Sequence, residues 1–284
     1  MSLAGELLRS DDTAVEVGHA GRMLFRYVFR PQTPADEAPR PYLHPVRTLA
    51  GAELTNFRPN DHRWHHALSY TLTCVSGTNF WGGGSYRPAD GYQWRPDHGE
   101  QRHVAWSAHD GGRLAHTLEW WSAGGATVLL REERELTPRI EDARTWSLQW
   151  RARLENVSGG VLQLGNYHAT HGLAGSHYSG LQFRGARDLL DDHGDAAIGL
   201  SAEGGRDGEK AVHGAEATWM EWRGQKDTTM QRVAVRFANL TGPLHWFVRR
   251  GYPLAALSPH FDREQALAPG EALVVDHLLT FSDL

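Results

Sequence analysis

Hydrophobic residues recur at every second position over long stretches of this 284-residue sequence. The clearest case is segment 145–156, whose alternate positions are Trp146, Leu148, Trp150, Ala152 and Leu154. A two-residue period is typical of a β-strand with one buried face. Further strands or hairpins are predicted over 14–29, 116–137, 232–240, 244–250 and 271–281. We therefore predict an all-β fold, a large antiparallel β-sandwich formed as a single domain by residues 1–284.

Two segments interrupt this pattern. Residues 30–41 contain four prolines, which cannot donate backbone hydrogen bonds, so this segment is predicted to be an arm or linker. Residues 201–214 are polar and rich in glycine, and we predict an exposed loop there.

Composition excludes several classes of partner. The net charge is −5 and no basic block is present, so we expect neither nucleic acid nor a membrane surface as a partner. The lone cysteine, Cys74, cannot form an internal disulfide, and its apolar strand predicts burial. No apolar run approaches the roughly 20 residues of a membrane helix, and no signal segment is seen. We expect a cytoplasmic protein; the oligomeric state stays open.

Tryptophan and histidine are abundant, with 11 and 17 residues. An indole offers a flat apolar face and one N–H donor, which suits the apolar face and hydroxyl edge of a sugar ring. The excess therefore favours carbohydrate as a small-molecule partner. The alternative is that these indoles fill the core of a large β protein.

The stretch "DHRWHH" places Asp61, His62, His65 and His66 within six positions, and His44 lies upstream. Imidazoles near neutral pH can act as general acids and bases on a substrate. Two or three of them with a carboxylate can instead bind a transition metal, and His62 and His66 would share one face of an extended strand. A structural polar cluster is the third alternative.

Two further groups of residues are candidates for ligand binding. On either side of three successive glycines, Trp81 and Trp94 could form a platform for a sugar, or pack back onto a sheet as part of a long hairpin loop. The segment 165–185 carries His168 and His171 and ends near Arg184, whose guanidinium suits a carboxylate or vicinal hydroxyls.

Several motifs resemble one bacterial family. These are His44-Pro45-Val46-Arg47, Asp61-His62 with His65, and Asn79-Phe80-Trp81, followed by "LREERE", "YSGLQFR" and "EATWMEWRG". From about residue 15 the chain resembles soluble bacterial proteins labelled methane oxygenase PmoA. The methane monooxygenase subunit of that name is an integral membrane protein, and this sequence contains no membrane-spanning segment, so we do not expect methane oxidation.

A second resemblance is to the galactose mutarotase-like supersandwich. It rests on "WHHALSY", "NYHATHGL" and the final "LAPGEALVVDHLLTF". The resemblance implies that His65 or His66 polarises a sugar and that His168 or His171 donates a proton. That family has a glutamate base before the last strand, whereas "YPLAALSPHFD" has none here, so Asp262, His260 or another carboxylate would replace it.

Together these observations predict a sugar-active enzyme of the epimerase, lyase or hydrolase type. The predicted catalytic residues are His65, His66, His168 and His171. The predicted substrate-binding residues are His44, Asp61, His62, Trp81, Trp94 and Arg184. No cofactor is expected. The alternatives are a metalloenzyme or oxygenase that holds a divalent transition metal with His62 and His66, and a non-catalytic carbohydrate-binding protein.

Overall fold

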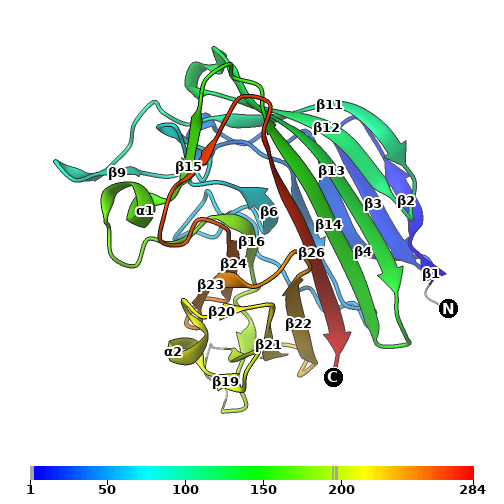
Figure 1. The fold of residues 1–284 in the computed structure, drawn as a ribbon. Coiled ribbons are helices and arrows are strands. Elements are labelled where there is room, and N and C mark those ends of the chain that lie inside the picture. Colours follow the sequence, from blue (N-terminus) through cyan, green and yellow to red (C-terminus); the bar gives the residue numbers. More distant parts are fainter. Residues whose placement is uncertain (1–2, 194, 196–197) are drawn as a thin grey trace.

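Two large antiparallel sheets form the body of the protein in a computed structural model, which describes residues 3–193, 195 and 198–284. Figure 1 shows their strands in two layers. The first sheet has the order β2 (Glu6–Ser10), β3 (Ala14–His19), β4 (Arg22–Val28), β5 (Tyr42–Val46), β6 (Leu68–Thr71), β16 (Gly180–Arg184), β24 (Leu254–Ser258), β23 (Leu244–Arg249) and β20 (Glu216–Ala217).

The second sheet contains the longest strands. Its order is β11 (Glu100–His109), β12 (Leu114–Trp121), β13 (Val128–Ile140), β14 (Thr145–Asn156), β26 (Ala272–Asp283), β22 (Arg232–Asn239), β21 (Trp219–Lys226), β18 (Gly199–Ala202) and β19 (Arg206–Asp207). Two short strands also join it: β1 (Leu3–Ala4) pairs with β13, and β17 (Leu189–Leu190) pairs with β21. The predicted all-β antiparallel sandwich is confirmed.

The alternation in β14 sets which face of the second sheet is buried. Its residues at positions 146, 148, 150, 152 and 154 are almost completely buried, while Arg151 and Arg153 are exposed. The indole of Trp146 stacks on Phe281 in the same sheet and on Phe25 of β4 in the other, with ring centroids 4.4 and 5.9 Å apart. One continuous cluster of buried hydrophobic residues thus joins the two sheets.

Smaller elements cover one end of this sandwich, at the left of Figure 1. A four-stranded sheet has the order β25 (Gln265–Leu267), β15 (Leu162–Gly165), β7 (Cys74–Val75) and β8 (Thr78–Asn79). A hairpin pairs β9 (Ser85–Arg87) with β10 (Gly91–Gln93). The helices are short: η1 (Ala35–Glu37), η2 (Ala123–Gly125), α1 (Tyr167–His171) and α2 (Glu209–Val212).

Two sequence predictions about irregular segments need correction. The proline-rich segment 30–41 is not a free arm, because Glu37, Ala38 and Arg40 are buried and η1 lies within it. Segment 201–214 is not a simple exposed loop, since it contains β19 and α2, and Val212 is fully buried. In both segments a few side chains packed into the interior fix a backbone that composition alone describes as irregular. Cys74 is buried, as predicted.

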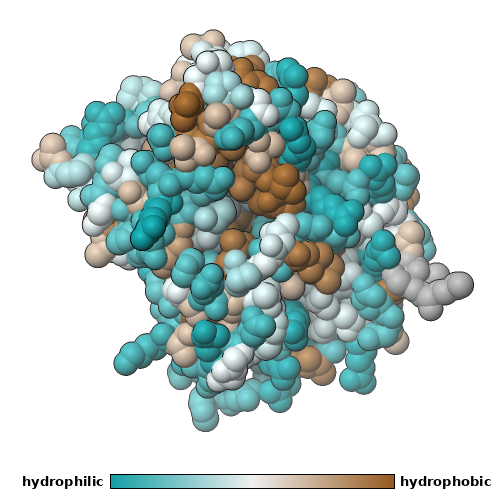
Figure 2. Space-filling view, viewed as in Figure 1, coloured by the Kyte–Doolittle hydropathy of each residue, from teal (hydrophilic) through white to brown (hydrophobic). Residues whose placement is uncertain are grey.

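The surface is mixed in character. Figure 2 shows hydrophobic residues in separate patches on a largely hydrophilic face. Within the described ranges, none of the helices has the length and hydrophobicity needed to cross a membrane.

Candidate functional site

A cavity of about 450 Å³ opens where the loops at 62–65 and 81–84 meet β10, β23 and β24. This volume lies within the range of about 300–1,000 Å³ that is usual for small-molecule sites. Aromatic side chains dominate its wall: Trp64, Trp81, Tyr92, Trp94, Tyr178, Phe247 and Tyr252. The polar groups are few: His62, His65, Gln93 and Arg249. Among the described residues, no aspartate or glutamate lines the cavity.

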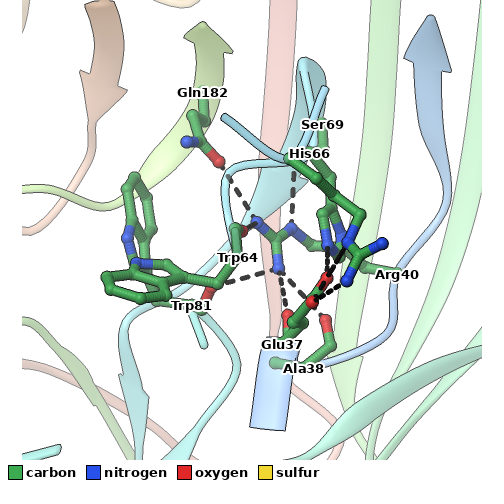
Figure 3. A network of polar contacts seen from close by, with 9 residues as sticks. Glu37, Ala38, Arg40, Trp64, His66, Ser69, Trp81 and Gln182 are labelled. Atoms are coloured by element: carbon green, nitrogen blue, oxygen red, sulfur yellow. Dashed lines mark hydrogen bonds and ion pairs between the residues drawn. The ribbon is translucent and has the colours of Figure 1, made fainter. Parts of the chain in front are cut away.

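Arg40 holds the two loops of this wall in place from behind (Figure 3). Its guanidinium is fully buried and donates to the carbonyl of Trp64 at 2.7 Å and to that of Trp81 at 3.1 Å. Its other acceptors are the carbonyls of Glu37 and Ala38, Oε1 of Gln182 and Oγ of Ser69. Burial lowers the pKa of Arg40 to about 9, which still leaves it charged at neutral pH. One cation therefore satisfies backbone carbonyls that would otherwise be buried without partners.

Two of the three successive glycines, Gly82 and Gly83, allow Trp64 to lie against the backbone. A Cβ on Gly83 would come within 2.5 Å of the indole of Trp64, and the φ of Gly83 is +74°. A Cβ on Gly82 would lie 2.7 Å from Cβ of Trp64. Both positions need glycine because of this close approach and the left-handed backbone. The glycines serve to pack Trp64, which the sequence did not single out.

His65 and Arg184 meet at the base of the cavity. His65 is 4% exposed, and its Nδ1 lies 3.4 Å from Nη1 of Arg184. Burial, and then the charge of Arg184, lower the pKa of His65 well below 6.5, so its imidazole is neutral. Because a guanidinium only donates, Nδ1 of His65 accepts, and its hydrogen resides on Nε2. His65 can therefore donate one hydrogen bond to a ligand.

Asp61 joins this pair to His62. Its carboxylate binds Nη2 of Arg184 at 3.0 Å and Nη2 of Arg187 at 2.5 Å. Burial opposes ionisation of Asp61, but the charge and hydrogen bonds of Arg184 hold its pKa well below the usual value. Nδ1 of His62 lies 3.2 Å from Oδ2 of Asp61, and the two imidazoles of His62 and His65 stack with centroids 4.8 Å apart. The carboxylate of Asp61 is therefore within ion-pair distance of His62.

His66 points away from the cavity. Its Nε2 lies 3.1 Å from Oε2 of Glu37, and that carboxylate also accepts from Nε and Nη2 of Arg58 at 2.9 and 2.7 Å. Burial lowers the pKa of His66 to about 3, so it too is neutral. Burial opposes ionisation of Glu37, yet hydrogen bonds from His66 and Arg58 lower its pKa. This group fixes η1 behind the wall, and a catalytic role of His66 stays a prediction.

The remaining predicted residues lie in three places. Trp81 is buried in the wall and Trp94 is exposed at its edge, while Arg184 lies behind His65. His44 is bonded to Thr55 outside the lining, at 2.9 Å. His168 and His171 belong to α1 and do not line the cavity. The predicted catalytic histidines therefore do not converge on one space.

Several lining residues were not predicted. Arg249 donates to Nδ1 of His213 at 3.1 Å, and its Cζ lies 4.3 Å from the centre of the Phe247 ring. Tyr252 covers Arg184, with Cζ 4.6 Å from its ring centre. These residues belong to segments whose only sequence signal was that of strands and their connections. Arg249 and Tyr252 line the cavity because the end of β23 and the turn that follows it lie there.

The predicted metal ligands are not assembled. In the described part of the chain, no group of three potential ligands includes His62 or His66. Asp61 faces His62 and Glu37 faces His66, so the two imidazoles have separate partners.

The chain is similar to one protein family and to several solved structures. A model described as "Family of unknown function (DUF6807)" matches residues 14–283. The galactose 1-epimerase from Lactobacillus acidophilus NCFM has a TM-score of 0.41 and 10% identity, covering 100% of this chain and 99% of its own. A GalM/aldose epimerase homologue from C. elegans has a TM-score of 0.38 and 9% identity, covering 100% of both. No curated protein matches this chain. The methane oxygenase label appears in none of these results and stays a prediction.

Proposed function

This chain belongs to DUF6807, a family of unknown function, and we propose that it binds a monosaccharide or modified glycoside in the cavity and moves a proton on it. The observation that carries the proposal is the cavity wall, which combines aromatic faces with the paired imidazoles of His62 and His65. Aromatic faces suit the apolar side of a sugar ring, and a few convergent polar groups orient it.

The two imidazoles have different roles in this proposal. His65 is neutral, and its Nε2–H polarises a carbonyl or ring oxygen of the sugar. His62 accepts a proton from the sugar, and the carboxylate of Asp61 lies 3.2 Å from its Nδ1. Arg184 keeps Asp61 ionised and holds His65 in the donating tautomer.

Because no carboxylate among the described residues lines the cavity, fewer types of reaction fit it. Most glycoside hydrolases use two carboxyl groups on either side of the scissile bond. The cavity instead favours proton abstraction from a carbon next to a carbonyl, as in epimerisation or elimination. The predicted metal-dependent oxygenase gains no support from this cavity, because His62 and His66 do not form a ligand set.

The test is a screen of sugars and keto-sugars by tryptophan fluorescence, followed by proton NMR in D₂O on any ligand found. We expect saturable binding and incorporation of solvent deuterium into the sugar. Trp94→Ala should weaken binding roughly tenfold, about 1.4 kcal/mol, because Trp94 is exposed at the cavity and its loss leaves the core intact. The matched control is Trp219→Ala, a tryptophan of β21 that does not line the cavity.

Two outcomes separate this proposal from its rival. The aromatic wall would also suit a non-catalytic carbohydrate-binding protein. That alternative predicts that His62→Ala binds sugar normally and that the unmodified chain incorporates no deuterium into the sugar. Equal binding by Trp94→Ala and the unmodified chain would show that the sugar binds elsewhere.

A further inference from the structure

A second group of chemically active side chains lies outside the cavity lining. One nitrogen of His168, one nitrogen of His177 and one carboxylate oxygen of Asp262 all lie within 4.8 Å of one another. Oδ1 of Asp262 is 3.5 Å from Nδ1 of His177 and 3.8 Å from Nε2 of His168. The two imidazole centroids are 3.9 Å apart. We propose that these three side chains form a binding site for a divalent transition metal.

Asn166 brings the two halves of this site together. It is fully buried and caps α1, where its Oδ1 accepts from the backbone N–H of Ala169 at 2.8 Å. Its Nδ2 donates to the carbonyl of Phe261 at 3.1 Å, so one side chain ties the helix of His168 to the turn of Asp262. Fixed backbones on both sides reduce the ordering that ligand binding would otherwise require.

The segment that carries His177 is fixed in the same way. The backbone N–H of His168 donates to the carbonyl of Ser176 at 3.2 Å, which holds the next residue, His177, beside α1. Oγ of Ser258 donates to the carbonyl of His177 at 2.7 Å. These bonds hold the backbones that carry the two imidazoles side by side.

Backbone carbonyls select the tautomer of both imidazoles. Nδ1 of His168 lies 3.3 Å from the carbonyl of Leu173, and Nδ1 of His177 lies 2.9 Å from that of Phe261. Since a carbonyl only accepts, each Nδ1 carries the hydrogen and each Nε2 keeps a free lone pair. The exposed carboxylate of Asp262 now lies beside Nδ1 of His177 and would turn toward the two Nε2 atoms to complete the ligand set. Metal-binding histidines commonly have such a partner on the second nitrogen, where it orients the ring.

The donor set indicates the kind of metal. Two imidazoles and one carboxylate suit zinc, iron(II) or cobalt(II), whereas magnesium and calcium prefer oxygen ligands alone. Three protein ligands leave positions for water or another ligand. Asp262 has a side chain that is 58% exposed, so a metal ion can reach the site from solvent.

This site is next to the cavity but separate from it. His177 lies between Gly175 and Tyr178, and both of these residues line the cavity. None of the three proposed ligands does so in the described structure. The metal proposal therefore stands or fails independently of sugar binding.

The experiment uses the full-length chain, stripped of metal with a chelator and dialysed. Zinc is titrated in competition with a chromophoric chelator, and cobalt(II) absorption reports the coordination. We expect one zinc per chain, with micromolar or tighter affinity. His168→Ala and Asp262→Asn should each weaken zinc binding at least about tenfold. Asp262→Asn is the more informative variant, because this exposed side chain is not needed for the core.

His171→Ala is the matched control, since it removes another histidine of α1 that is not in the group. It should bind zinc as the unmodified chain does. Circular dichroism checks that each variant is folded. The proposal is overturned if the unmodified chain binds no zinc in stoichiometric amount, or if the folded Asp262→Asn and His168→Ala variants bind it unchanged.

Discussion

Nη1 of Arg184 lies 3.4 Å from Nδ1 of His65; both side chains are buried, His65 as part of the cavity wall and Arg184 behind it. The contact joins residues 119 positions apart in the sequence. Burial, and then the charge of Arg184, lower the pKa of His65 and keep it neutral, and because a guanidinium can only donate, the hydrogen of the ring resides on Nε2.

The first prediction concerns the pH dependence of this donor. Burial and Arg184 lower the pKa of His65 well below 6.5, so the imidazole stays neutral throughout the range from pH 6 to pH 8. The ratio of ligand affinities between the unmodified chain and His65→Ala should therefore be constant over this range. Fluorescence titrations at several pH values measure it. A change in the ratio with a midpoint near pH 6.5 would mean that His65 titrates as an exposed histidine.

The second prediction concerns the close approach of Trp64 to the glycines. Gly83→Ala should destabilise the protein by about 2–3 kcal/mol, since its methyl group would overlap the indole and its φ is +74°. Gly84→Ala is the matched control, because a Cβ there meets its nearest neighbour at an ordinary 3.5 Å. Urea unfolding measures both. If Gly83→Ala and Gly84→Ala had equal free energies of unfolding, Trp64 could move away from residue 83 without destabilising the fold.

The third prediction concerns the carboxylate behind the wall. Glu37→Gln should lower the free energy of unfolding by about 1–3 kcal/mol, because an amide nitrogen cannot accept from Arg58 and the pair loses its charge. Glu155→Gln removes an exposed carboxylate paired with Arg153 and should cost less than about 1 kcal/mol. Urea unfolding of both variants at pH 7 gives the comparison. If Glu37→Gln lowered the free energy of unfolding no more than Glu155→Gln does, the buried pair of Glu37 and Arg58 would not stabilise the fold as proposed.

The fourth prediction concerns acid stability. Burial lowers the pKa of His66 to about 3 and the pKa of His260 and His277 to about 4, and it lowers the pKa of His65 and His116 well below 6.5. Below pH 6.5 the unfolded chain binds protons at these positions and the folded chain does not. Stability is therefore complete above pH 6.5 and decreases as the pH falls toward 4.

We expect unfolding between pH 6 and pH 5 to take up at least two protons, a loss of about 3 kcal/mol across that unit. Urea unfolding at pH 7, 6 and 5 measures this. His277→Met should reduce the pH dependence by about one proton, because the ring nitrogens of His277 are buried and without a hydrogen-bond partner in the described structure. Constant stability from pH 7 to pH 5 would contradict the lowered pKa values of these buried imidazoles.

The fold could be predicted from local patterns because each strand repeats its own signal. The alternation in β14 is enough to assign its buried face, and the hairpin of β3 and β4 is visible in segment 14–29. The proximity of Asp61, His65 and Arg184 could not be derived from spacing, since it depends on the loop before β6 meeting the end of β16.

Other parts of the site carried no sequence signal. Arg40 lies in a proline-rich segment, and most of its partners are backbone carbonyls, which every residue possesses. Arg249 ends an ordinary strand, and only the neighbouring loops place it at the cavity. An unusual cluster of side chains can be recognised in a sequence. These two arginines belong to no such cluster, so their positions at the cavity could not be predicted.

The place of β26 in the second sheet has a consequence for how the protein is made. This strand lies between β14 and β22, so it joins the two halves of that sheet. During synthesis on the ribosome, residues 100–156 and 199–239 emerge before the strand that connects them. Until residue 283 has left the exit tunnel, β14 and β22 each present an unpaired edge, and unpaired edges are sites of aggregation. Until β26 has emerged, the nascent chain should therefore be prone to aggregation, and its second sheet should become continuous only when that strand pairs.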